Sequence, residues 1–251
     1  KRLCSREVSV LKSYFAAGLF DTMVEEPPTK KAKVDSLGTL TYFPLLAKGL
    51  APALCAEFSG LAWKGNKDTG FAFPSWGDLK ASGKPPFGQL PILETGDLVI
   101  GQSTAICNYI GHVAGTAGKD ANEYAMSQML MAEGEDIYTL MQKYQPTIMK
   151  KEKAEDNAKF WAEVAPAELK KLEKLLDSTS GDCFTSSGKT IGELYLFAMM
   201  HQMVLVSSDC LKDTPALKKF YDATKDLPGV QKVLTGESSM GKLDPYFIVK
   251  A

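Results

Sequence analysis

The pattern of hydrophobic and polar positions along the chain changes at about residue 116. In residues 39–116, short runs rich in branched and aromatic residues alternate with apolar segments of helical spacing. The runs TLTYF, AWKGN, QLPILE and DLVIG are typical of strands. The runs GLAPALCAEFSGL and GDLKAS, and the segment from Ser103 to Val113, are typical of helices. The predicted order is therefore β-α-β-α-β-β-α.

The last two predicted strands are joined by a Gly-Asp turn. A connection this short cannot cross over a sheet, so we expect the two strands to pair antiparallel. Pro91 stands at the start of the first strand, where its missing N–H removes no ladder hydrogen bond. If the Leu90–Pro91 bond is cis, it would leave the backbone of Leu90 facing outward, able to pair with an extended peptide. The alternative is that Pro91 merely begins a strand, and the spacing favours neither.

Residues 117–251 contain no convincing strand. Apolar residues lie three and four apart in four segments, 122–145, 157–178, 190–206 and 215–227. Thr190 and Glu193 form a T-x-x-E capping box, which predicts that a long buried helix begins there. We therefore expect an α/β domain over residues 39–116, followed by a larger all-α domain over residues 117–251.

Residues 1–38 form an extension ahead of the first predicted strand. Apolar residues recur there at helical spacing, at Val8, Leu11, Phe15 and Leu19. This pattern predicts an amphipathic helix, which packs on its own protein or binds a partner through residues 1–24. The run EEPPTKKAKVDS follows without periodicity and indicates a solvated linker. Its PPTKKAKV portion also resembles a short basic nuclear-localisation signal, although such clusters are common in linkers.

Composition and charge narrow the classes of function. The formal net charge is −1, so nothing global suggests nucleic acid or an anionic membrane as a partner. No apolar run approaches the roughly 18 residues that a membrane span needs. The five cysteines are scattered and form no CxxC pair, which argues against a disulfide framework or a zinc site and favours a reducing compartment. The two histidines, His112 and His201, nearly exclude histidine-based metal or triad chemistry.

We expect a cytoplasmic protein that holds no metal. Because the chain begins with Lys1 rather than Met, the alternative is an organelle reached after removal of a targeting peptide.

Gln102 and Ser103 interrupt an apolar pattern where a strand passes into a helix. The free N–H groups and positive dipole end of a helix N-terminus attract a carboxylate. The local pattern by itself favours a simpler interpretation, in which Ser103 is an ordinary N-cap. Motifs elsewhere in the chain favour the ligand-binding interpretation over the simple N-cap.

The chain resembles the cytosolic glutathione transferases of the tyrosine type (sigma, pi and alpha) over about residues 39–249. The resemblance rests on Tyr42-Phe43-Pro44, on the motifs WGDLKAS, FGQLP and GDLVIGQS, on the capping box and on the closing DLPGVQKVL…YF stretch. It implies a thioredoxin-like βαβαββα domain followed by the all-helical transferase domain. It also implies a homodimer that adds the glutathione thiolate to small hydrophobic electrophiles.

The same resemblance assigns a candidate site. Tyr42 matches the catalytic tyrosine, whose hydroxyl donates a hydrogen bond to the glutathione sulfur. The positions that match glutathione-binding residues are Lys48, Trp76, Lys80, Gln89, Leu90, Pro91, Gln102 and Ser103. Phe43 and Tyr144 match residues of the acceptor pocket, with a core or interface tyrosine as the alternative for Tyr144.

The chain departs from the family pattern at four places. Lys48 stands where arginine is frequent, which exchanges a bidentate contact for a point charge, and Ala47 replaces a frequent glycine. A KPP-containing insertion stretches the segment after Lys80. Related enzymes often extend an acid from the neighbouring subunit to the γ-glutamyl amine, and an ungapped comparison places that position on Ala132. Glu133 beside it is our candidate for this acid, with Asp136 a turn later as the alternative.

Two further functions stay open at this point. One is a transferase-like structural or assembly subunit with little turnover, which the amphipathic extension and the uncertain acid favour. The other is a glutathione-dependent isomerase, whose glutathione half would look the same. The loop from Pro44 to Gly49 holds neither Cys nor Ser, and we expect Cys55 to be a small buried side chain. A cysteine-type thiol-transferase mechanism is therefore disfavoured.

Overall fold

A computed structural model describes residues 34–150, 154–179 and 182–248. The predicted amphipathic helix, with the candidate partner-binding segment 1–24, lies outside these ranges, as do residues 25–33 of the predicted linker.

The N-terminal domain contains a mixed four-stranded sheet. Its elements are β1 (Ser36–Thr41), α2 (Leu50–Phe58), β2 (Ala62–Lys64), α3 (Asn66–Thr69), the 3-10 turn η1 (Phe73–Ser75), α4 (Trp76–Ala81), β3 (Ile92–Thr95), β4 (Leu98–Gly101) and α5 (Ser103–Ala114). The strand order is β2-β1-β3-β4, with β1 parallel to β2 and antiparallel to β3. β3 and β4 form the antiparallel hairpin that the short turn predicts. The βαβαββα order is confirmed, with α3 and η1 as additional short turns.

The first strand begins earlier than its sequence pattern predicts. β1 starts at Ser36, inside the range assigned to the extension, and it ends before Tyr42. Gly38 lies within the strand at a φ of 93°, and a Cβ atom there would come within 1.9 Å of the Glu94 carbonyl oxygen. Only glycine allows β3 to approach so closely, whereas in a sequence pattern glycine indicates a break.

The helical domain contains α6 (Ala121–Tyr144), α7 (Ala154–Lys159), the π-helical turn η2 (Phe160–Val164), α8 (Ala165–Asp177), α9 (Ile191–Val206), α10 (Pro215–Lys225) and α11 (Pro228–Leu234). The capping box at the start of α9 is confirmed. The Glu193 carboxylate accepts from the Thr190 N–H at 2.7 Å, and Thr190 Oγ1 accepts from the Glu193 N–H at 3.5 Å. α9 is buried along most of its length, as its continuous apolar run predicts.

The helix predicted over residues 157–178 is interrupted by η2. Pro166 follows this turn, and its ring nitrogen cannot donate to the carbonyl four residues earlier. In the residue before the proline, the Ala165 N–H donates to the Phe160 carbonyl five residues earlier, which is the π-helical pattern.

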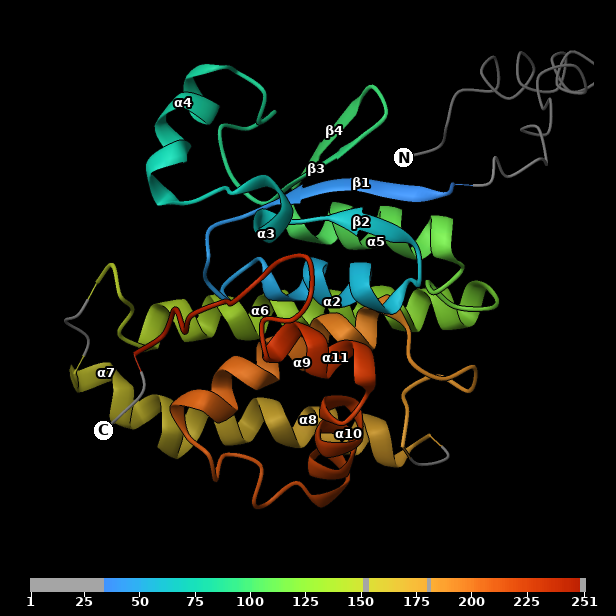
Figure 1. Cartoon of the computed structure of the whole chain (residues 1–251). Coiled ribbons are helices and arrows are strands. Elements are labelled where there is room, and N and C mark those ends of the chain that lie inside the picture. The colour runs from blue at the N-terminus through green and yellow to red at the C-terminus, as the bar shows by residue number, and fades with distance from the viewer. Residues whose placement is uncertain (1–33, 151–153, 180–181, 249–251) are drawn as a thin grey trace, which may run out of the picture. The chain divides into compact units, whose positions relative to one another are not determined.

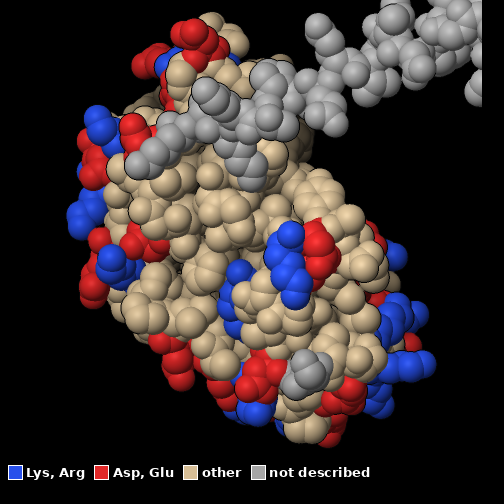
Figure 2. All heavy atoms as spheres, turned by 90° about the vertical axis from the view of Figure 1, so that its right-hand side faces the viewer, with Lys and Arg blue, Asp and Glu red and all other residues tan. Residues whose placement is uncertain are grey.

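The two domains share one continuous core. α2 and α5 lie beneath the sheet on the side of the helical domain, and α9 packs against α2, α5 and α6 (Figure 1). On the face shown in Figure 2, acidic and basic side chains are intermixed. Within the described ranges, no helix combines the length and the apolar character that crossing a membrane requires.

Candidate glutathione site

Strand pairing brings three separate segments to one edge of the sheet. Thr41 pairs with Ile92, and Ile92 pairs with Gly101. The residues that follow β1, precede β3 and follow β4 therefore emerge side by side. The Leu90–Pro91 bond within the middle segment is cis.

A cavity of about 370 Å³ opens at this edge and reaches α6 of the helical domain. The predicted residues that line it are Phe43, Lys48, Trp76, Gln89, Leu90, Pro91, Gln102 and Ser103. The sequence did not single out the other lining residues, Phe87, Gly88, Gly101, Thr104 and Glu135.

The start of α5 differs from a simple capped helix. Gln102, not Ser103, is the N-cap residue, and its side chain makes no capping hydrogen bond. The interpretation of Ser103 as an ordinary N-cap is therefore wrong: its hydroxyl lies 2.9 Å from Tyr195 Oη instead. Gln102 has a φ of 70°, a left-handed conformation that costs a non-glycine residue roughly 1–3 kcal/mol. Strain of this kind at a cavity wall is typical of a ligand-binding position.

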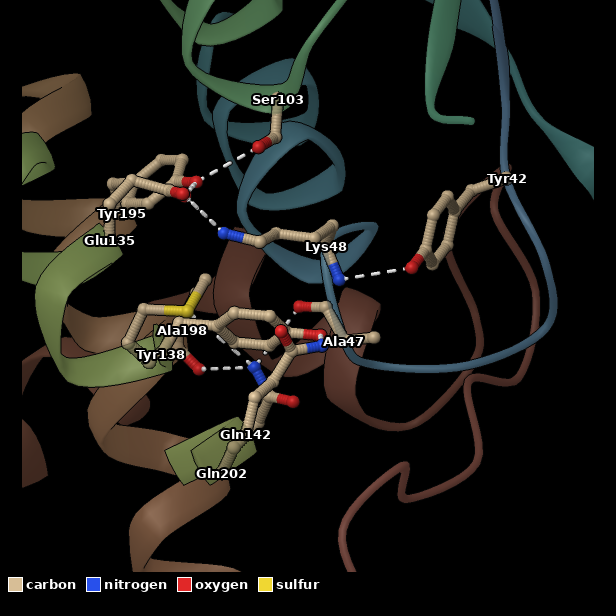
Figure 3. A network of polar contacts seen from close by, with 11 residues as sticks. Tyr42, Ala47, Lys48, Ser103, Glu135, Tyr138, Gln142, Tyr195, Ala198 and Gln202 are labelled. Carbon is tan, nitrogen blue, oxygen red and sulfur yellow. Dashed lines mark hydrogen bonds and ion pairs between the residues drawn. The ribbon is translucent and has the colours of Figure 1, made fainter. Parts of the chain in front are cut away.

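Lys48 is the basic residue among the cavity-lining side chains, and it is ion-paired. Its ammonium lies 2.5 Å from both carboxylate oxygens of Glu135 and 4.0 Å from the centroid of the Tyr138 ring (Figure 3). Tyr195 donates a hydrogen bond to Glu135 and contacts Ser103, so this network joins α6 and α9 to the start of α5. Burial lowers the pKa of Lys48, and the Glu135 carboxylate opposes that shift.

Sequence reasoning considered the acids on either side of Glu135 but not Glu135 itself. The signal was present, because Glu135 follows Met131 by four residues and precedes Tyr138 by three. Both of these neighbours are buried, so Glu135 is a charged residue on the inward face of an amphipathic helix. Such a residue needs a partner, and Lys48 provides it.

Tyr42 follows β1 directly and packs against the start of α2. A Cβ atom at Gly49 would lie 2.2 Å from Tyr42 Cδ1, so the ring rests on the bare Cα of that glycine. Tyr42 Oη accepts a hydrogen bond from the Lys48 N–H at 3.2 Å. Tyr42 is 7% exposed and does not itself line the cavity. Burial raises its pKa to about 12, against the effect of the Lys48 N–H, so its hydroxyl keeps its proton at neutral pH.

Aromatic rings form one wall of the cavity. Phe43 stacks on Phe73 with ring centroids 5.1 Å apart and meets Trp76 edge-on at 5.6 Å. Phe43 and Trp76 line the cavity; Phe73 does not, but it is 48% exposed and extends the aromatic surface of Phe43 beside the cavity.

Besides Tyr42, three predicted site residues do not line the cavity. Lys80 is exposed on α4, and its Cε lies 3.9 Å from where a Cβ of the rim residue Gly88 would stand. Glu133 lies near Glu168 on α8, and burial together with that neighbouring carboxylate raises its pKa. Tyr144 stacks on Phe160 with centroids 5.7 Å apart. Asp136, the alternative acid, is exposed.

The described cysteines are all free thiols, and Cys55 is fully buried, as expected from its position in α2. Among the described residues, no group of three or more His, Cys, Asp or Glu side chains is placed to hold a metal ion.

A thioredoxin-like domain joined to an all-helical domain, with a cavity where strand ends meet a helix N-terminus, defines the glutathione transferase class of fold. Two family models match the chain: Glutathione S-transferase, N-terminal domain, over residues 68–112, and Glutathione S-transferase, C-terminal domain, over residues 136–237.

Relatives and solved structures agree with these matches. The chain is 27% identical to Glutathione S-transferase P of Caenorhabditis elegans over 203 residues, which cover 80% of this chain and 93% of the relative. It is 29% identical to Glutathione S-transferase 1 of Ascaris suum over 197 residues, covering 77% and 93%. The crystal structure of the glutathione S-transferase from Ascaris lumbricoides superposes with a TM-score of 0.64 at 26% identity, covering 78% of this chain and 95% of that one.

The chain belongs to the glutathione S-transferase family and is an enzyme of that transferase class. Members of this family use glutathione as co-substrate and typically form dimers.

Proposed function

We propose that the protein conjugates the thiolate of glutathione to small hydrophobic electrophiles, with Tyr42 as the catalytic residue that stabilises the thiolate. The observation that carries this proposal is that the predicted residues come together in space. The eight predicted residues that line the cavity come from segments far apart in the sequence, and they meet around a space of about 370 Å³.

The cavity offers a suitable partner for each charged end of the tripeptide. The N-terminus of α5, with Gln102 and Ser103, would hold the γ-glutamyl carboxylate, because its first N–H groups have no helical partners. The Trp76 indole, with Lys80 at the rim, would bind the glycyl carboxylate. The backbone of Leu90 would pair with the cysteinyl portion as an added strand. The Lys48 ammonium has three donors, so it can bind a further carboxylate while it stays paired with Glu135.

The chemistry depends on the protonation state of the thiol. A free thiol has a pKa of about 8.5, and lowering that value by two units takes about 2.7 kcal/mol of preference for the thiolate. A protonated tyrosine hydroxyl can supply energy of this order as a hydrogen-bond donor, helped by nearby N–H dipoles. The raised pKa of Tyr42 suits a donor rather than a base. Holding the thiolate beside an electrophile on the aromatic surface of Phe43 would supply much of the remaining rate.

Substitution of Tyr42 by phenylalanine tests this proposal. We expect Tyr42→Phe to bind immobilised glutathione as wild type does, and to conjugate a generic aromatic halide about 10–100-fold more slowly, a loss of roughly 1.4–2.7 kcal/mol in transition-state stabilisation. Tyr109→Phe is the matched control, because it also deletes a partly buried hydroxyl, one that contacts Thr95 Oγ1 at 3.1 Å.

Each other outcome has a distinct meaning. Failure of the wild type to bind glutathione at millimolar concentration would refute the proposed conjugation reaction. Turnover that is indifferent to Tyr42→Phe would move the catalytic role to another residue. Glutathione binding without turnover by the wild type would favour the structural or assembly subunit.

A further inference from the structure

A single peptide unit is held at both ends in the turn between Tyr42 and α2. The Lys48 N–H donates to Tyr42 Oη at 3.2 Å, and the Ala47 carbonyl accepts from Gln202 Nε2 at 3.1 Å (Figure 3). The N–H and the carbonyl belong to the same planar unit and point in opposite directions. Any rotation of this unit that breaks one hydrogen bond therefore weakens the other.

The backbone next to this unit is strained. Ala47 has a φ of 22°, in the region that favours glycine, and it is 2% exposed. A non-glycine residue stays in such a conformation only where its surroundings hold it there. Gln202 is one such contact, and it comes from α9 in the helical domain.

The surroundings of Gln202 fix which end of its amide faces the turn. Its Nε2 lies 3.1 Å from the Ala47 carbonyl oxygen and 3.4 Å from that of Ala198. If the amide were reversed, Oε1 would face these two carbonyl oxygens, and three acceptors would meet without a donor. Its own Oε1 is buried and has no hydrogen-bond partner among the described residues. A glutamine that leaves half of its amide unsatisfied is a costly way to fill a core position, where methionine would fit. Its contribution therefore lies in the bond to Ala47.

We propose that Gln202 is a positioning residue for catalysis: by holding the Ala47 carbonyl, it keeps the Lys48 N–H aimed at Tyr42 Oη and leaves the hydroxyl proton of Tyr42 for the glutathione sulfur. This inference rests on the proposed function of Tyr42. A hydroxyl that accepts one hydrogen bond becomes a stronger donor in the next, because the two polarise each other. α9 thus acts on the reacting thiol through Ala47, Lys48 and Tyr42, although Gln202 does not line the cavity.

The test is the pKa of the thiol of enzyme-bound glutathione, read from thiolate ultraviolet absorbance as a function of pH. Gln202→Met keeps the volume and removes the donor. We expect it to raise the bound thiol's pKa by about 0.5–1 unit and to lower kcat/KM roughly 3–10-fold at pH values below that pKa. The KM for glutathione should change less than about two-fold, because this substitution removes no contact with the tripeptide.

The matched control is Gln145→Met. Gln145 is also a fully buried glutamine of the helical domain, and its Oε1 accepts at 2.7 Å from Asn157, which is not a residue of the turn. We expect it to lower stability and to leave the thiol pKa at the wild-type value. Adding Ala47→Gly to Gln202→Met should restore the thiol pKa, because glycine holds a positive φ without help. If Gln202→Met does not fold, Gln202→Asn, whose shorter amide cannot reach Ala47, should give the same shift.

The outcomes separate this inference from the proposed function. If Tyr42→Phe leaves the bound thiol's pKa unchanged, the role of Tyr42 is refuted and the positioning role falls with it. If Tyr42→Phe raises that pKa while the folded Gln202 variant matches wild type, the positioning role is overturned and the proposed function stands. The same holds if Gln145→Met shifts the thiol pKa as much as Gln202→Met does.

Discussion

Gly49→Ala tests whether the place of the Tyr42 ring determines activity. Gly49 has φ −87° and ψ −26°, which alanine adopts without strain, so the cost of the substitution is mainly steric. The new Cβ would stand 2.2 Å from Tyr42 Cδ1, 2.8 Å from Cγ and 2.9 Å from Cε1, so the ring must move. Overpacking of this kind costs about 1–3 kcal/mol, and alanine is also slightly worse than glycine as the N-cap of α2. We expect a loss of about 2–3 kcal/mol in the free energy of unfolding.

Urea unfolding and conjugation kinetics, measured on the same preparation, check this prediction. Gly77→Ala is the control: it lies in α4 with no atom within 4 Å of the added Cβ, and we expect it to stabilise by about 0.5–1 kcal/mol with kcat/KM unchanged. Gly49→Ala should lower kcat/KM at least about 10-fold, because the Tyr42 hydroxyl moves with its ring. In a Tyr42→Phe background, the ring clash remains, so Gly49→Ala should still destabilise but reduce activity little further. An unfolding free energy and a kcat/KM both equal to those of wild type would refute the steric reasoning.

Two further predictions concern the core of the helical domain. Burial lowers the pKa of His201 to about 4 from the ordinary 6.5, so the stability that depends on neutral His201 is complete above pH 6.5 and is lost as the pH falls toward 4. That loss amounts to about 3 kcal/mol. His201→Gln, which can still bond Tyr221 Oη, should flatten the pH dependence of the free energy of unfolding, measured in urea, between pH 4 and 6.5. An unchanged pH dependence would show that His201 is not the group responsible. Glu193→Ala removes the acceptor for the N–H groups of Thr190 at 2.7 Å and Phe184 at 2.6 Å, and we expect it to lower the free energy of unfolding by about 2–4 kcal/mol. A loss below about 1 kcal/mol would show that the start of α9 does not depend on this carboxylate.

Local patterns were sufficient for the elements whose determinants lie within a few residues. The Thr190–Glu193 box marks the start of α9, and the short turn between β3 and β4 requires an antiparallel hairpin. The two misses have different causes, a distant segment in one case and a local residue in the other. Gly38 lies inside β1 because β3 passes close to it, and Pro166 interrupts a periodic helix by removing one donor.

Some residues of the candidate site could be predicted from short motifs, and others could be found only in the structure. Motif resemblance pointed to residues that surround the cavity, such as Trp76, Gln89 and Gln102, because each lies in a short, distinctive stretch. It did not point to Glu135 or Gln202. Helical patterns leave many positions equivalent, and the partners of these two residues, Lys48 and Ala47, are close only after the domains pack together.

The sequence by itself therefore determined the order of the elements, the change from mixed α/β to helical structure and the short motifs that surround the candidate site. Only the tertiary structure decided which side chains complete that site. The ion pair of Lys48 with Glu135 and the bond from Gln202 to the Ala47 carbonyl cross from one domain to the other. Such contacts depend on how the surfaces of the two domains pack together, and the spacing of residues along the chain does not show which side chains then come within contact distance.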